Sequence, residues 1–264
     1  MESGLTMMMR ARHQRTVVAG LVAVVMMTVA ACGEDGDDAA SSTVDTTATA
    51  TRTASQATTI ADPAPGSIPA GDGSIEPGTY RVPGSVWSVA DFMVTFPADW
   101  SVQYGHVYNK HHDTEDDELG FYAVVVDEIY ADACAGSASG LAADIGPSVD
   151  DLAAALLAQP GPLASDPVDT TLGGYPAVRI DLTVAEDFDL TACNLYQDGF
   201  LGLQVWYSRP ADKYFVLPPD SVASVYILDV DGQRQVILTG TRSTSSAEDV
   251  AELQSILDTI RFDP

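Results

Sequence analysis

Basic residues are scarce in this chain of 264 residues. Lys and Arg together number 12 against 38 Asp and Glu, which gives a formal net charge of −26 at pH 7. Binding to a nucleic-acid backbone requires clustered basic side chains, so the composition argues against a nucleic-acid partner. Lys110 and Lys213 are the only lysines. The acidic surface that results favours solubility.

Long apolar runs are also lacking. The most apolar segment, residues 16–31 (TVVAGLVAVVMMTVAA), is shorter than the roughly 20 residues that a membrane-spanning helix needs. Arg10, Arg12 and Arg15 precede it. A basic start, a short apolar core and small residues at its end are typical of a secretory signal. Residues 1–31 are therefore predicted to be a signal peptide that is removed on export.

Cysteine is rare and its count is odd, because only three are present. Cys32 directly follows the apolar run, and the quartet Val29-Ala30-Ala31-Cys32 resembles the lipobox of bacterial lipoproteins. The resemblance implies that Cys32 carries a diacylglycerol thioether and anchors the mature chain to the outer face of the cell membrane. Two acyl chains give a stable anchor. The alternative is an ordinary signal peptide with a cysteine nearby by chance.

Cys134 and Cys193 are the two cysteines that remain. Disulfides persist in extracytoplasmic compartments, so an exported chain is predicted to pair them. Closing the loop between them contributes about 4 kcal/mol in the chain-entropy model. Two buried free thiols are the alternative.

Residues 32–74 are rich in Ala, Ser, Thr, Pro and Gly and contain almost no large apolar side chain. Such a segment buries too little surface to offset its ordering entropy, so a disordered tether is predicted. Residues 75–264 are enough for one domain with a core of its own.

Strand-like alternation of apolar and polar residues recurs in this domain. In AVRIDLTV, residues 177–184, the apolar side chains fall on one face. Asp231-Gly232 separates two further runs, SVYILDV and QRQVILTG, and favours a type I′ hairpin. Most strands are expected to be antiparallel and joined by short turns.

Two helices are predicted. Ser148 is the expected N-cap of the first, and Pro160 follows its end. The second begins with an expected capping box from Ser245 to Glu248. Its predicted apolar stripe consists of Val250, Leu253, Leu257 and Ile260. Together these elements predict an α+β fold, a mainly antiparallel sheet covered by helices.

The motifs VTFPADWSV and GGYPAVRIDLTV and a terminal helix ending in IRF resemble the PsbP-like α/β/α sandwich group. PGTYRVPG, YADAC, GPSVDDL and LDVDGQRQVI resemble a family of bacterial lipoproteins of unknown function with this architecture. The resemblance covers nearly all of residues 75–264 and implies the sandwich fold. That family has a cysteine pair at matching places, which agrees with pairing Cys134 and Cys193, and it implies no catalytic residue.

Catalytic motifs are lacking as well. The chain contains no G-x-S-x-G, S-x-x-K, P-loop, H-E-x-x-H or C-x-x-C pattern. The segment starting at Asp229 fails as a calcium loop because Arg234 stands where that loop needs glycine. A non-enzymatic protein without catalytic residues, metal or cofactor is predicted. A cell-wall hydrolase with two facing carboxylates is the least favoured alternative.

All histidines of the mature chain, His106, His111 and His112, lie in HVYNKHHDTEDDELG beside several carboxylates. Imidazole and carboxylate groups could together bind Zn²⁺. A solvated loop between two strands is the favoured interpretation. No metal site is predicted.

Trp87 and Trp206 fall outside the obvious apolar faces, and KYFVLPPD places Tyr214 and Phe215 beside a Pro-Pro turn. These aromatic residues indicate either a binding surface or packing in the core. The function predicted from the sequence is that of a lipid-anchored binding domain for a protein or small ligand. The alternative is a carrier of a metal ion or small apolar ligand.

Overall fold

The computed structural model describes residues 65–111, 118–142, 144–193 and 201–263. These residues fall in the second of two units into which the chain divides, Pro63–Pro264. The predicted signal peptide, Cys32 and most of the expected tether lie outside the described residues. No helix among the described residues is long and apolar enough to cross a membrane.

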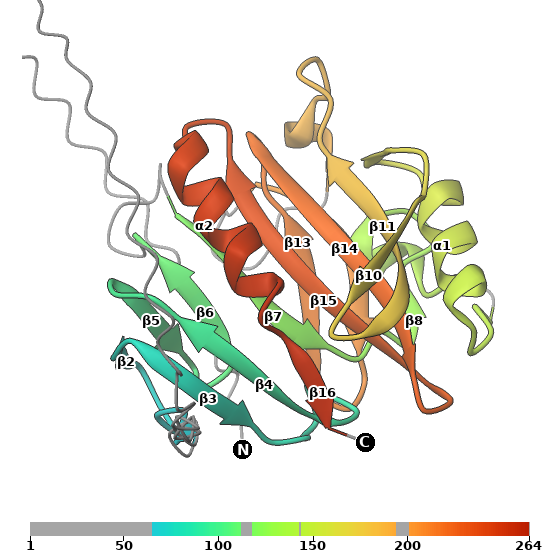
Figure 1. Cartoon of the computed structure of the whole chain (residues 1–264). Coiled ribbons are helices and arrows are strands. Elements are labelled where there is room, and N and C mark those ends of the chain that lie inside the picture. Colours follow the sequence, from blue (N-terminus) through green and yellow to red (C-terminus); the bar gives the residue numbers. More distant parts are fainter. Residues whose placement is uncertain (1–64, 112–117, 143, 194–200, 264) are drawn as a thin grey trace, which may run out of the picture. The chain divides into compact units, whose positions relative to one another are not determined.

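A nine-stranded sheet forms the centre of the domain (Figure 1). Its path consists of β10 (Val168–Leu172), β11 (Tyr175–Thr183), β14 (Ser221–Val230), β15 (Gln233–Arg242), β7 (Leu119–Val124), β6 (Val107–Lys110), β5 (Trp100–Gln103) and β2 (Gly73–Ile75), and β9 (Leu163–Ala164) pairs with β11. All its pairings are antiparallel. The structure is therefore mainly β with two α-helices, as the sequence predicted at this level.

Two smaller sheets complete the fold. One has the order β1 (Gly66–Ser67), β3 (Gly78–Val82), β4 (Asp91–Phe96) and β16 (Arg261–Asp263). The other consists of β13 (Lys213–Leu217), β12 (Leu203–Ser208) and β8 (Glu128–Ile129). Short 3₁₀ turns occur at Gly136–Ser139 and Leu190–Ala192.

The central sheet is apolar on both faces, so the domain has two cores. Along β14, Val225 and Ile227 join one core with helix α1 (Val149–Ala158) and the three-stranded sheet. Tyr226 and Leu228 alternate with them and join the other core with α2 (Ala247–Leu257) and the four-stranded sheet. The two helices therefore pack against opposite faces of the sheet, and Figure 1 shows α2 lying along one of them.

The local signals of the sequence explain several elements. Ser148 caps α1 and forms a capping box with Asp151. Asp231 and Gly232 have φ values of 53° and 85° and form the two-residue turn between β14 and β15, as predicted. Gly120 allows β7 to lie close to β6, because a Cβ there would stand 2.3 Å from the Tyr108 carbonyl oxygen.

Other local predictions were wrong. The N-cap of α2 is Ser246, whose side chain accepts from the Asp249 amide. Ser245 instead accepts from the Arg242 amide before the helix begins. The buried stripe therefore includes Ile256, whereas Val250 is 41% exposed.

The start of the domain also differs from the expected boundary at residue 75. β1 lies within the segment assigned to the tether, and β2 begins in that segment. β1 pairs in parallel with β3, and β2 pairs with β5. The small residues of these strands do not prevent pairing, because strand pairing uses main-chain groups. At Gly66 the lack of a side chain makes room for the Tyr80 ring, since a Cβ there would stand 2.9 Å from a ring carbon.

Candidate functional site: a groove beside helix α1

A groove with a volume of about 470 Å³ lies beside α1. One wall is the outward face of the second half of the helix, followed by Gln159 and Pro160. The other walls come from Ile129–Ala131 and from residues near Ile145. The volume is in the range of sites for small ligands, about 300–1,000 Å³.

The second half of α1 is apolar all round its circumference. After Leu152 the sequence reads AAALLA, with no polar side chain up to the end of the helix. Ala153 and Leu156 are buried in the core, while Ala154, Leu157 and Ala158 are exposed. Surface helices normally carry polar side chains on the outward face. The outward face of this half of α1 is therefore apolar where Ala154 and Ala158 line the groove.

Arg234 holds the segment before α1 in place. Its guanidinium donates to the carbonyl oxygens of Gly146 at 2.7 Å, Ser148 at 2.9 Å and Val126 at 2.8 Å. Burial lowers the pKa of Arg234, and the nearby carboxylates of Asp151 and Asp127 oppose this shift. No lysine or arginine is among the described residues that line the groove, and the nearby Arg234 is committed to main-chain oxygens.

Gln159 closes α1 and is 7% exposed. Its Nε2 donates to the carbonyl oxygens of Tyr130 at 2.9 Å and Val205 at 2.7 Å. These two acceptors fix the orientation of the amide, because the flipped amide would direct oxygen at both carbonyls. Oε1 is buried and receives no hydrogen bond from the described part of the chain. An unpaired buried acceptor costs about 1–3 kcal/mol.

Carboxylates stand at the other end of the groove. Asp151 accepts from the amide of Ser148 at 3.0 Å, and its hydrogen bonds with the side chain and amide of Ser148 lower the pKa of Asp151. Asp144 accepts from the amide of Gly146 at 3.3 Å. Asp144 and Asp151 are both exposed and both line the groove.

The disulfide between Cys134 and Cys193 is present, in agreement with its prediction. It joins residues 59 positions apart, and Cys193 belongs to the core beneath α1. The amide of Ala133, beside the bridge, donates to the Pro160 carbonyl oxygen at 3.1 Å. The bridge therefore fastens the turn that contacts the end of the groove.

The predicted histidine cluster is divided. The ring of His106 stacks on Trp87 at a centroid distance of 3.7 Å, and burial lowers the pKa of His106. His111 lies near Asp249 instead, with Nε2 at 3.5 Å from a carboxylate oxygen. His112 and the acidic residues at 113 and 115–117 lie outside the described residues. Within the described ranges no group of three His, Cys, Asp or Glu side chains could hold a metal ion.

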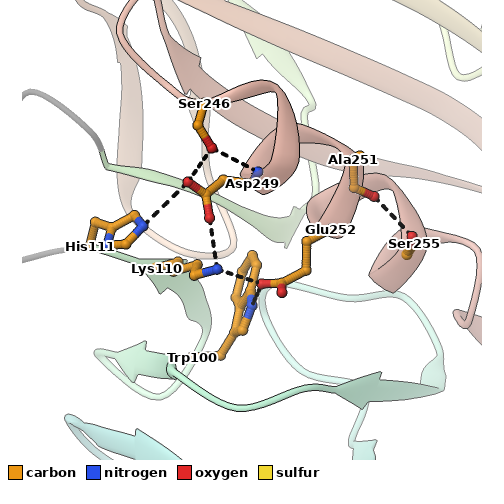
Figure 2. A network of polar contacts seen from close by, with 8 residues as sticks. All are labelled: Trp100, Lys110, His111, Ser246, Asp249, Ala251, Glu252 and Ser255. Carbon is orange, nitrogen blue, oxygen red and sulfur yellow. Dashed lines mark hydrogen bonds and ion pairs between the residues drawn. The ribbon is translucent and has the colours of Figure 1, made fainter. Parts of the chain in front are cut away.

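Lys110 lies in a polar network that links β6 to α2 (Figure 2). Its Nζ is 2.7 Å from Asp249 and 2.9 Å from Glu252, and the Trp100 indole donates to Glu252 at 2.8 Å. Burial disfavours the charge of Lys110, but the hydrogen bonds to both carboxylates outweigh it and raise the pKa of Lys110. A lysine held in its charged form lacks the free electron pair of a nucleophile. The network therefore fastens α2 to β6.

The aromatic residues of the sequence hypothesis belong mainly to packing. Trp206 is 1% exposed and stacks on Phe215 at 4.5 Å. A register shift between Gln204 and Trp206 in β12 turns the indole into the core, which strict alternation did not foresee. The groove was missed at the sequence level. Its signal was present in the polar-free end of the first predicted helix, immediately before Gln159.

No protein-family model matches the chain, and no curated protein matches its sequence. Among solved structures, the chain is distantly similar to a protein from Bacteroides thetaiotaomicron, with a TM-score of 0.31 and 11% identity. The alignment covers 70% of this chain and 48% of that one, so this chain spans about half its length.

A second distant similarity is to LpqN of Mycobacterium tuberculosis, described as involved in cell envelope biogenesis. The TM-score is 0.27 at 16% identity, with 73% of this chain and 83% of that chain covered. Similarity at this level assigns no family, and the site is interpreted from its own residues.

Proposed function

We propose that this protein is a non-enzymatic, lipid-anchored extracytoplasmic protein whose domain binds a ligand in the groove beside α1. The observation that carries the proposal is the apolar wall that Ala154, Ala155 and Ala158 of α1 give to a groove of about 470 Å³. A groove of this size favours a small ligand over a flat protein interface. The proposal therefore combines two functions considered from the sequence, a binding domain and a carrier of a small apolar ligand.

The anchor in this proposal is a diacylglycerol on Cys32, at the outer face of the cell membrane. The signal sequence and the lipobox resemblance support it, and the Cys134–Cys193 bridge agrees with an oxidising compartment. The resemblance to lipoproteins with a PsbP-like sandwich points the same way. Metabolic labelling with a clickable fatty acid tests the anchor, since the label should disappear in a Cys32→Ala variant.

Filling the groove tests the binding site. Ala154 is an exposed position on its wall, so Ala154→Trp should occupy the groove without disturbing the core. Val250→Trp is the matched control, at a 41% exposed position of the other helix on the opposite side of the sheet. The native lipoprotein and both variants are purified in mild detergent, and their extracts are compared by mass spectrometry.

A small molecule that accompanies the native protein and the Val250→Trp variant, and is missing from Ala154→Trp at unchanged Tm, is the expected result. Equal retention by all three proteins would place the ligand elsewhere.

A further inference from the structure

The polar groups of the groove are almost all acceptors. Among the lining side chains, those of Asp144 and Asp151 are acceptors, Gln159 brings its unpaired Oε1, and Tyr130 has a hydroxyl that can also donate. Nε2 of Gln159 is already committed to two carbonyl oxygens. A ligand that satisfies this lining must therefore bring hydrogen-bond donors.

We propose, resting on the binding function above, that the groove selects a small apolar amine in its protonated form. The apolar body lies along the outward face of α1, and the ammonium group is held by the acceptors of the groove. The preference combines two independent features, the negative charge of the lining and the orphaned acceptor of Gln159.

Charge is the first feature. Asp144 and Asp151 both line the groove, and Arg234 nearby is turned to main-chain oxygens. The chain as a whole carries a net charge of −26, which attracts cations at long range. An anionic ligand would face two carboxylates without a free cation among the lining residues that the structure describes.

The orphaned acceptor is the second feature. Oε1 of Gln159 is buried without a donor from the described residues, whereas most buried polar atoms in proteins are paired. An N–H group that reaches it recovers the cost of its burial. Because Gln159 lines the groove and is only 7% exposed, the proposal places the donor inside the groove and not on its rim.

Four probes with one phenyl-ethyl body separate these features: phenethylamine, 2-phenylethanol, 3-phenylpropionate and phenethyltrimethylammonium. The first two donate hydrogen bonds, the third is an anion, and the fourth is a cation without any N–H group. Each is titrated at pH 7 into the full mature chain carrying Cys32→Ser, which keeps the tether and the disulfide. Amide chemical shifts of Ala131, Ala154 and Ala158 report binding in the groove.

Phenethylamine should bind at least about tenfold more tightly than phenethyltrimethylammonium, since only the amine can donate a charge-assisted hydrogen bond. 3-Phenylpropionate should bind most weakly. Asp144→Asn keeps the oxygen that accepts from Gly146 and removes one charge, so it should weaken phenethylamine severalfold and leave 2-phenylethanol unchanged.

The outcomes separate the two proposals. If all four probes shift the groove amides with equal affinity, the groove is a binding site and the amine preference is wrong. Equal binding of the trimethylated cation and the amine would refute the part assigned to Gln159. If no probe moves these amides, or if Ala154→Trp leaves the shifts unchanged, the groove itself is not the ligand site and both proposals fall.

Discussion

Replacing Lys110 by methionine should destabilise the domain mainly through the two carboxylates that it leaves behind. Asp249 and Glu252 both contact the Lys110 ammonium, and the side chains of Lys110 and Asp249 are only 14% and 17% exposed. Methionine keeps most of the aliphatic stem and packs no worse, so the loss isolates the charge. Without the ammonium group, the carboxylates of Asp249 and Glu252 repel each other while they remain partly buried.

The magnitude lies between those of exposed and buried pairs. Exposed ion pairs contribute about 0–1 kcal/mol, and removal of one partner from a buried pair costs about 3–5 kcal/mol. A cost of about 2 kcal/mol is expected for Lys110→Met. For a domain of this size, 1 kcal/mol corresponds to roughly 2–4 °C in Tm, so Tm should fall by about 4–8 °C at pH 7.

The effect should depend on pH with a defined sign. The hydrogen bond from Lys110, followed by that from Ser246, lowers the pKa of Asp249 from 3.8 to about 2. A lowered pKa in the folded state gives stability that is present above pH 4 and lost as the pH falls towards 2. The difference between the native protein and Lys110→Met should therefore be largest at neutral pH and shrink below pH 4.

Urea unfolding followed by circular dichroism, from pH 7 down to pH 3, measures this difference. Lys213→Met is the comparison for losing a lysine charge, because Lys213 is the only other lysine and is exposed on β13. Its effect should be smaller than that of Lys110→Met. A double-mutant cycle with Asp249→Asn isolates the pair. A Lys110→Met variant as stable as the native protein at pH 7, or a cost that does not change with pH, would refute the reasoning.

Three further outcomes are expected. Cys134→Ser combined with Cys193→Ser should cost about 2–4 kcal/mol in urea unfolding, and the denatured native protein should show no thiol from this pair without reductant. Gly120→Ala should cost more than about 3 kcal/mol, because its Cβ would collide with the Tyr108 carbonyl at 2.3 Å, whereas Gly240→Ala has nothing within 4 Å and should be nearly neutral. Because burial lowers the pKa of His106 below its usual 6.5, stability should fall as the pH drops through about 6.5, and His106→Phe should abolish that part of the pH profile.

Features that depend on a few neighbouring residues could be predicted well from the sequence. Ser148 capped the first helix and Asp231-Gly232 formed the hairpin, because a side-chain oxygen or a positive φ decides each locally. The cysteine pair could be predicted because lipidation of Cys32 leaves two cysteines and because disulfides persist in the compartment of an exported chain. The start of α2 failed by one residue because Ser245 and Ser246 are equivalent as caps until the backbone places one of them on the Arg242 amide.

The groove could not be predicted in the same way. Gln159 is buried by contacts with the carbonyl oxygens of Tyr130 and Val205, which are 29 and 46 positions away in the chain. Its orphaned oxygen exists only once these partners are in place. The bulge that buries Trp206 is likewise a property of strand pairing and has no signal in the alternation of the residues around it.

The pairing of β1 has a mechanical consequence for a domain held at its N-terminal side. Tension applied through the chain ahead of Gly66 reaches the fold first at β1, which pairs with β3 at only two positions. β3 itself pairs with β4 at five positions. β1 should therefore detach before the core feels the load, and each released residue adds up to about 3.3–3.6 Å of length. In the proposed lipid-anchored protein, the first strand would act as an extensible link between the anchor and the rest of the domain.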